Sequence, residues 1–403
     1  MKRGLSFIAS SILLTTPILA ESIDEAFKNA QVKGEIKAAY VDSNFLGSNE
    51  SDSLSAIGGS LNLITDQFYN TKAGLTFQTS SIINDDIKNT STSARVNYYH
   101  ASGSVLSEAY LEYSNKETSF KAGKQFIYTP LVSTAIEGKS SEAILKDSFN
   151  AYILTNTSIE NTTVVLGHVT TYQAQTDSNG NIGDFVDVED GATTLYVKNT
   201  SAKNTTIQAQ YLQISGKTAS ADKDAFYLQA DYQYGKQTLS AQYIASTDKS
   251  KATDAQDGKA IGLKATGPLG ISNLAYLAAY TTSTDSKSDV YVGAGEGTTE
   301  TLFTAMPVHG GGVPARADTD TMVGAIIIPT PMATLIPYYG ASNSSTHVLG
   351  DVSAYGAMAI VPLAKNLLLK ANYEHVETEN IIAVAGINKK ETDTSKVSLS
   401  YKF

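Results

Sequence analysis

Apolar and polar residues alternate along most of the chain. Between residues 226 and 234, Phe226, Leu228 and Ala230 would lie on one face of an extended strand, and Gln229 and Asp231 would lie on the other. A period of two residues predicts a β-strand with one apolar and one polar face. The same alternation recurs in further segments, among them 32–40, 207–211, 367–374 and 397–403.

The number of such segments predicts a large barrel. We expect about 18 strands, or about 16 if the weakly patterned second and third strands do not form. A soluble β-sandwich also alternates, but alternation over this many hairpins would be unusual for one. The strands are expected to begin near residues 32, 58, 72, 106, 118, 150, 163, 193, 205, 226, 237, 260, 272, 321, 333, 353, 366 and 396.

The connections between these segments alternate in length. Residues 234–236 and 363–365 are short connections, whereas 42–52, 79–102 and 282–320 are long ones. Outer-membrane barrels have short periplasmic turns and long external loops, and an even strand count returns both termini to the periplasm. The sequence therefore predicts an all-β fold, a transmembrane antiparallel β-barrel.

The composition narrows the class of function. The 403 residues include no Cys, which excludes thiolate metal centres and cysteine nucleophiles, and they include 23 Tyr, which suits the aromatic girdles of a barrel. The formal net charge of −10 argues against a nucleic-acid partner, because binding to phosphates needs a basic surface. Past residue 20, no segment approaches the ~20 apolar residues of a membrane helix.

Both ends of the chain carry export signals. Lys2 and Arg3 precede an apolar stretch over 5–19, so residues 1–20 are predicted to be a signal peptide cut after Ala20. Residues 21–403 would then form a single barrel domain. The last strand has an apolar residue at every second place and ends at Phe403, which is typical of recognition by the barrel assembly machinery.

Several segments resemble a known family. Together they resemble the OprD-type outer-membrane porins of Campylobacterota, the group that includes the Campylobacter major outer-membrane porin. The similar segments are 23–27 (IDEAF) with 32–36 (VKGEI), 122–125 (AGKQ) with 129–131 (TPL), 149–173, 305–308 (AMPV) through 314–315 and 318–320, and the closing 401–403 (YKF).

The resemblance implies more than the pattern does. It implies an eighteen-stranded, homotrimeric barrel whose third external loop, 128–148, folds inward as a constriction. It also implies that the long seventh external loop, 282–320, reaches the lumen, with His309, Arg316 and Asp318 as candidates. The family guides carboxylates along a ladder of arginines, but past residue 20 this chain has only Arg95 and Arg316, which cannot form one.

Selectivity in a pore depends on the charges at its narrowest ring and along its wall. The constriction candidates are Glu137, Lys139, Glu142, Lys146 and Asp147. The alternation assigns to the pore wall Lys33, Glu35, Lys37, Glu108, Glu112, Lys121, Lys198, Asp231, Lys370 and Glu374. Both signs are present, so weak selectivity is expected, and the net negative charge favours cations.

The predicted function is an outer-membrane porin for passive diffusion of ions and small hydrophilic solutes. Two alternatives remain: a channel selective for small carboxylates or amino acids, and a surface adhesin or receptor. The expected surroundings are outer-membrane lipid and lipopolysaccharide.

No enzyme, metal centre or cofactor is expected. The five His lie in no G-x-S-x-G or H-E-x-x-H pattern, and His168 would be the residue to test for a hydrolase. The acidic stretch with Asp184, Asp187, Glu189 and Asp190 could bind Ca²⁺, but it matches no EF-hand spacing, and a solvated loop is the preferred interpretation.

Overall fold

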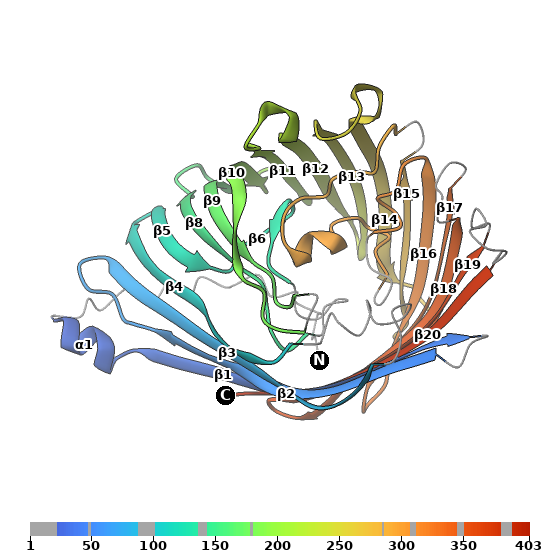
Figure 1. The fold of residues 1–403 in the computed structure, drawn as a ribbon, viewed down its shortest axis with the longest axis horizontal. Coiled ribbons are helices and arrows are strands. Elements are labelled where there is room, and N and C mark those ends of the chain that lie inside the picture. The colour runs from blue at the N-terminus through green and yellow to red at the C-terminus, as the bar shows by residue number, and fades with distance from the viewer. Residues whose placement is uncertain are drawn as a thin grey trace.

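The structure is a computed structural model of the chain. It describes residues 22–46, 50–87, 101–135, 143–177, 180–283, 286–306, 312–344, 350–379 and 389–403. Within these residues, 18 strands form one antiparallel sheet. Each strand pairs with the next one in sequence, and β1 also pairs with β20, so the sheet closes into the ring seen in Figure 1.

The strands follow the predicted order. The eighteen barrel strands are β1 (Gln31–Leu46), β2 (Glu50–Ile64), β3 (Thr71–Ile87), β4 (Gly103–Asn115), β5 (Thr118–Gln125), β8 (Ser148–Asn156), β9 (Thr162–Gln173), β10 (Phe185–Asn199), β11 (Thr205–Ile214), β12 (Lys223–Tyr234), β13 (Gln237–Asp248), β14 (Asp257–Pro268), β15 (Ala275–Thr282), β16 (Thr319–Pro329), β17 (Thr334–Ser344), β18 (Asp351–Ala364), β19 (Leu367–Glu379) and β20 (Lys389–Lys402). The predicted fold class is confirmed, and the alternative of sixteen strands is wrong.

Several strands extend further toward the long loops than the sequence indicated. β2 begins at Glu50 rather than near residue 58, and β1 pairs with it as far as Phe45, so most of the expected loop 42–52 is strand. β10 and β20 likewise begin at Phe185 and Lys389. Polar residues dominate these extensions, so hydropathy marked them as loops, although backbone pairing does not require apolar side chains.

The two ends of the barrel differ. At one end the strands are joined by short connections such as 235–236 between β12 and β13, and at the other end by longer ones such as 283–318 between β15 and β16. We call these the short-turn end and the long-loop end.

The first strand and the C-terminal residue meet at the barrel seam. The Gly34 amide donates to the Phe403 carbonyl over 2.8 Å, and the Phe403 amide donates to the Gly34 carbonyl over 3.0 Å. A Cβ on residue 34 would lie 2.3 Å from the Phe403 ring, so the glycine makes room for the C-terminal aromatic side chain. The last residue of the chain thereby completes the closure.

A short helix, α1 (Ile23–Lys28), precedes the first strand at the short-turn end. The Ser22 hydroxyl accepts from the Glu25 amide and caps its first turn. The Ala26 carbonyl accepts from Asp66 in the connection between β2 and β3. Among the described residues, no helix is long and apolar enough to cross a membrane.

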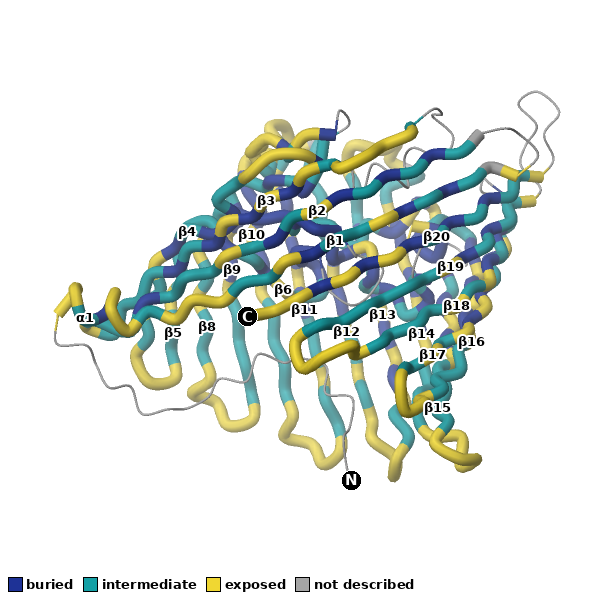
Figure 2. The backbone as a smooth tube through the Cα atoms, turned by 90° about the horizontal axis from the view of Figure 1, so that it is seen from below, coloured by how far each residue is buried: buried dark blue, intermediate teal, exposed yellow. Residues whose placement is uncertain are grey.

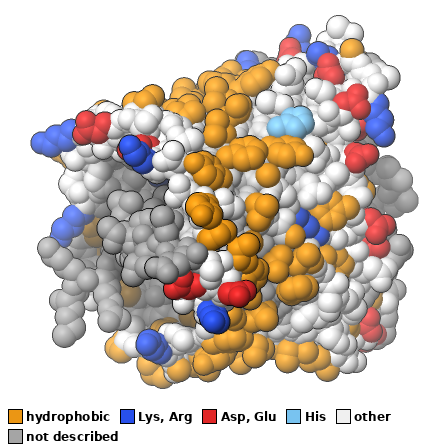
Figure 3. Space-filling view, turned by 90° about the vertical axis from the view of Figure 1, so that its left-hand side faces the viewer, with side chains coloured by type: hydrophobic (Ala, Val, Ile, Leu, Met, Phe, Trp, Pro, Cys, Tyr) orange, Lys and Arg blue, Asp and Glu red, His pale blue; other side chains and the backbone are white. Residues whose placement is uncertain are grey.

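The two faces of the wall divide as the alternation predicts. Outward residues such as Leu61, Leu111 and Leu263 remain between 46% and 60% exposed, whereas inward residues such as Gln210 and Glu374 are buried. Buried and exposed positions alternate along the strands in Figure 2. Hydrophobic side chains cover a broad part of the outer face shown in Figure 3.

Candidate functional site

Most of the described residues of two long connections lie inside the barrel. We call residues 126–147, between β5 and β8, loop 3, and residues 283–318, between β15 and β16, loop 7. Loop 7 contains the 3-10 helix η3 (Glu296–Glu300), which lies within the ring of strands in Figure 1. Together the two loops determine how much of the lumen stays open.

The first part of loop 3 docks on the luminal face of β11. It contains a small hairpin made of β6 (Tyr128–Thr129) and β7 (Val132–Ser133). The Leu131 amide donates to the Gln210 side chain over 2.8 Å, and the Gln210 amide group donates to the Thr129 hydroxyl over 2.9 Å. Leu131 and Val132 are fully buried, so the hairpin is fixed by both packing and hydrogen bonds.

The last part of loop 3 contacts the opposite side of the barrel. The Lys37 ammonium group on β1 donates to the Ala143 carbonyl over 3.2 Å. The Lys146 amide donates to the Gln78 side chain on β3 over 3.2 Å. Because β11 and the β1–β3 strands face each other across the ring in Figure 1, loop 3 has attachments on both sides of the lumen.

Loop 7 pairs directly with loop 3. The Ser133 amide donates to the Ala294 carbonyl and the Ala294 amide donates to the Leu131 carbonyl, both over 3.0 Å. This makes a parallel bridge between Val132 and Ala294. The Thr301 hydroxyl adds a bond of 2.8 Å to the Pro130 carbonyl.

Glycines allow this close approach. A Cβ on Gly293 would lie 2.2 Å from the Leu131 carbonyl oxygen, and one on Gly297 would lie 2.2 Å from the Thr134 carbonyl oxygen. Gly293 also has a φ of +122°, which favours glycine. Loop 7 therefore seats on loop 3 only because these positions have no side chain.

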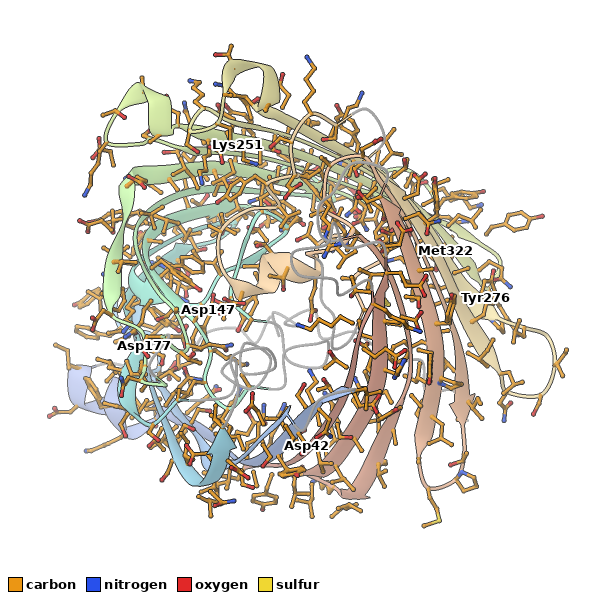
Figure 4. All side chains as sticks on the ribbon, turned by 45° about the vertical axis from the view of Figure 1, so that its right-hand side comes forward. Asp42, Asp147, Asp177, Lys251, Tyr276 and Met322 are labelled. Carbon is orange, nitrogen blue, oxygen red and sulfur yellow. The ribbon has the colours of Figure 1, made fainter. Side chains whose placement is uncertain are left out.

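Asp147 ties the two loops together. Its carboxylate is fully buried and accepts from the Ala135 amide over 2.5 Å and from the Glu296 amide over 3.1 Å. Figure 4 shows Asp147 inside the ring, close to η3. Burial raises the pKa of Asp147 from 3.8 to about 7, although the two amide donors act in the opposite direction.

The luminal face beneath the loops is apolar. Leu212 and Ile244 point inward near the long-loop end of β11 and β13, and both are buried against loops 3 and 7. Val41 and Leu54 form a second cluster with Ala143 of loop 3. A third cluster joins residues of loop 7 to the wall and consists of Met306, Val313, Val323, Val352, Ala354 and Val376. These clusters form an apolar luminal ring near the long-loop end.

The alternation of buried and exposed positions puts the ten predicted wall residues on the luminal face, and two ion pairs lie on β3–β5. Lys72 lies 3.3 Å from Glu112, and Lys121 lies 3.7 Å from Glu108. The Lys121 ammonium group also lies 3.6 Å from the centroid of the Tyr110 ring. Across the barrel, the Tyr338 hydroxyl donates to Glu374 over 2.8 Å. We call this part of the luminal face, toward the short-turn end, the polar wall.

A cavity of about 760 Å³ lies between the loops and the wall of β11–β15. Its lining combines polar groups of the wall, such as Gln208 and Asp231, with rings from the loops, such as Tyr128. The Lys264 ammonium group lies over the Phe303 ring at 4.2 Å. The cavity therefore offers charges of both signs and aromatic surface to a solute.

The predicted constriction residues have separate outcomes. Glu137, Lys139 and Glu142 lie outside the described residues, as does His309 of loop 7. Lys146 is half-buried on the β3 side of loop 3. Asp147 differs from expectation, because its buried carboxylate holds backbone amides instead of facing solutes.

The two described candidates of loop 7 lie near its end. The Arg316 side chain donates to the Gly350 carbonyl over 3.2 Å, which joins loop 7 to the connection between β17 and β18. Asp318 has a φ of +49° and precedes β16 directly. These contacts attach loop 7 to the barrel, and a role of either side chain in selectivity stays a prediction.

The sequence analysis missed the apolar luminal ring and the docking role of Gln210. A signal was present, because Leu212 and Ile214 follow Gln208 and Gln210 on the face of β11 that should be polar throughout. The switch from polar to apolar residues on one face marks the level at which the loops cover the wall.

Two further candidates can be placed. His168 is exposed on the outer face of β9, where its ring contacts the Thr193 hydroxyl at 3.1 Å. Asp187 and Glu189 belong to β10, so the acidic stretch is partly strand. The described residues include no group of three or more His, Asp or Glu that could hold a metal ion, and Ca²⁺ binding stays a prediction.

Comparison with known proteins shows which solved structures have a similar fold. No family model and no curated protein matches the chain. Its structure is similar to Pseudomonas aeruginosa OpdO, with a TM-score of 0.69 and 14% identity over 94% of this chain and 98% of that one. It is also similar to OpdQ of the same organism, with a TM-score of 0.71 and 13% identity over 94% of this chain and 99% of that one. For Acinetobacter baumannii OccAB1 the TM-score is 0.71 and the identity is 12%, over 96% of this chain and 100% of that one.

These neighbours are porins of the OprD/Occ type, and at such low identity they show a shared fold. The expected affiliation with Campylobacterota stays a prediction. The shared fold extends over nearly the whole chain, including the eighteen-stranded closure.

Proposed function

We propose that the chain is an outer-membrane channel through which ions and small hydrophilic solutes diffuse passively. The single observation that carries the proposal is the division of the closed wall into an apolar outer face and a luminal face that is polar outside the apolar luminal ring. An apolar outer face matches lipid, and a polar luminal face matches water. A soluble barrel would have the opposite arrangement, with polar residues outside.

The orientation follows from the same proposal. The long-loop end would face the outside and the short-turn end the periplasm. The mature chain would begin at residue 21, and Phe403 would direct insertion by the assembly machinery. A homotrimer in a lipopolysaccharide-containing membrane completes the proposal, and its support is the OprD/Occ-type fold.

Loops 3 and 7 would set the size limit for solutes. Both are held by buried backbone hydrogen bonds and by the apolar luminal ring, so they act as fixed parts of the pore wall. An enzymatic role finds no support in the barrel, because the fold of its neighbours is that of a channel.

Ion preference is proposed to be weak. Lysines and carboxylates pair on the wall, as in Lys72 with Glu112, and such pairs cancel at a distance. The negative net charge favours cations. The luminal Lys264 and Lys396, which the structure adds to the wall, act in the opposite direction.

A second candidate function is a channel selective for small carboxylates or amino acids. The observation that favours it is the set of inward lysines on several strands: Lys37, Lys72, Lys121, Lys264, Lys370 and Lys396. Lysines could replace arginines as point charges, although they lack the bidentate geometry of a guanidinium group.

Conductance of residues 21–403, refolded and inserted into a planar bilayer under a KCl gradient, tests the proposal. Stepwise currents with a cation-favouring reversal potential would support a general channel. An anion-favouring reversal potential would favour the second candidate, a channel selective for small carboxylates. A correctly folded barrel with no conductance would contradict both and favour an adhesin or receptor.

A further inference from the structure

A groove lies on the outer face of the barrel at the long-loop end of β11–β14, the strands at the top of Figure 1. Its volume is about 460 Å³. It differs from the luminal cavity because its floor consists of outward residues, among them Phe226 and Tyr243, which are 39% and 37% exposed. It therefore opens toward the medium that surrounds the barrel.

Strand register explains the groove. Phe226 pairs with Ala245, and Ala245 pairs with Lys259, so one outward row runs from β12 to β14 with its smallest side chain in the middle. The Phe226 and Tyr243 rings lie 6.5 Å apart and line the side nearer the membrane centre. The groove is thus a hollow above Ala245 with an aromatic side.

Two lysines edge the groove on the side of the long loops. Lys259 is exposed on β14, and the Lys287 amide of loop 7 donates to the Asp257 carbonyl, which places Lys287 beside Lys259. Neither lysine forms an ion pair within the described residues. Other lysines at the long-loop end form ion pairs, Lys223 with Asp248 and Lys249 with Asp222.

Two carboxylates complete the lining. Asp224 accepts from the Tyr211 hydroxyl over 2.6 Å, and Asp257 accepts from the Thr247 hydroxyl over 3.0 Å. Each carboxylate keeps further acceptor sites for hydroxyl donors. The groove therefore combines ammonium groups for an anion, carboxylates for hydroxyl groups and aromatic rings for an apolar surface.

We propose that this groove binds the phosphorylated sugar headgroup of a glycolipid in the outer leaflet. Lys259 and Lys287 would bind the phosphate, Asp224 and Asp257 would accept from sugar hydroxyls, and Phe226 and Tyr243 would contact the upper acyl chains. A plain phospholipid lacks the ring of hydroxyls that the carboxylates suit. The inference uses the membrane location of the proposed function but not its channel activity, so a failed conductance test would leave it standing.

Charge-removing variants test the phosphate contact. Bis-phosphorylated lipid A is added to the purified full-length barrel in detergent, and retained lipid is measured by native mass spectrometry. A lysine near anionic headgroups contributes about fivefold in affinity, so Lys259→Gln with Lys287→Gln should weaken binding about thirtyfold. The control is Lys217→Gln, an exposed lysine of the same rim outside the groove lining, which should change nothing.

A steric variant tests the hollow without changing charge. Ala245→Trp would fill the space between Phe226 and Lys259 and should abolish retention of lipid A. Ala241→Trp adds the same side chain to the same outward face of β13, nearer the short-turn end, and should leave retention unchanged. Heat-modifiable electrophoretic mobility reports whether each variant is folded.

The outcomes separate the ligands. Retention of lipid A by the parent, lost in both groove variants and kept in both controls, would support the proposal. Equal retention of dephosphorylated lipid A or phosphatidylglycerol would overturn it. Competition by millimolar inorganic phosphate that displaces the glycolipid would also overturn it, because the groove would then be a site for a free anion.

Discussion

The luminal face of this barrel differs between its two ends. Near the long loops it carries an apolar ring, with Leu212 and Ile244 buried under loops 3 and 7. Toward the short turns, the polar wall carries paired charges such as Lys72 and Glu112. One face of one sheet thus changes from a packing surface to a water-lined surface within a single strand length.

Apolar side chains on the luminal face allow a wide barrel to be narrowed by its own loops. Burying one Leu or Ile side chain is worth about 1.5–3 kcal/mol. Several such side chains under loops 3 and 7, together with the hydrogen bonds between the loops, oppose the entropy that would favour mobile loops. The polar wall has no such cover, so its charges face the solute path. In the proposed channel, the apolar ring would therefore set the size of the pore, and the polar wall would set its charge.

The largest effect is expected from separating the two loops. The double variant Gly293→Val, Gly297→Val places side chains against backbone oxygens of loop 3. The clash should destabilise the docked arrangement of the two loops by more than about 1–3 kcal/mol. Single-channel conductance should rise and become noisy while the barrel stays folded. The matched control is Gly312→Val in the same loop, where a Cβ meets nothing within 4 Å. Parent-like conductance of the double variant would contradict the account.

A cavity in the apolar ring should have the next largest effect. Ile244→Ala removes a fully buried luminal side chain, a change that costs about 2–5 kcal/mol in a packed core. Hydrogen exchange at the Leu131 and Ala294 amides should accelerate, because the first donates to Gln210 on the wall and the second to the Leu131 carbonyl of loop 3. Leu239→Ala, on the outer face of the same strand, is the control and should leave these amides protected.

Acidification should tighten the junction of the loops. The pKa of Asp147 is about 7 when buried and returns toward 3.8 when the loops open, so closing takes up a proton between these values. Protonation of Asp147 therefore stabilises the closed loops fully below about pH 4. This stabilisation is lost as the pH rises through 7. Burial raises the pKa of Glu296 as well, which acts in the same direction.

Exchange of the Ala135 and Glu296 amides, corrected for intrinsic rates, measures this effect. Protection should be greater at pH 5 than at pH 8. Asp147→Asn keeps a carbonyl acceptor but cannot ionise, so it should reduce the pH dependence strongly. A pH dependence that Asp147→Asn leaves unchanged would show that another group is responsible.

The smallest effect is expected on the polar wall. Glu112→Gln removes one carboxylate and frees the Lys72 ammonium group, so the reversal potential in a KCl gradient should shift modestly toward anions. Glu117→Gln, in the exposed short turn after β4, should shift it less. Equal shifts of the reversal potential would mean that the charges of the polar wall do not set the electric field in the lumen.

The sequence was sufficient for the barrel because alternation is a local property. Each strand reports its two faces without knowledge of its neighbours, and the predicted bounds of loop 7, 282–320, lie within two residues of the observed 283–318. Strand ends were less predictable, since the polar upper parts of β2 and β20 pair through backbone groups that side-chain pattern does not report.

The arrangement inside the lumen could not be predicted in the same way. Asp147 was predicted to be a charge of the constriction, because nothing near it in sequence indicates that amides from 12 and 149 residues away converge on its carboxylate. Gln210 was one glutamine among several on the polar face. Such roles depend on which distant backbone groups meet, and only the docked loops reveal it.

A disulfide cross-link can test whether loops 3 and 7 pair inside the barrel. The chain has no Cys, so V132C with A294C introduces a single possible disulfide. These residues form a β-bridge, and neighbouring strands lie about 4.8 Å apart, within the range that a disulfide spans. We expect complete disulfide formation in the folded barrel, with the conductance of the parent. A folded barrel that does not cross-link, or one whose conductance changes sharply when it does, would contradict it.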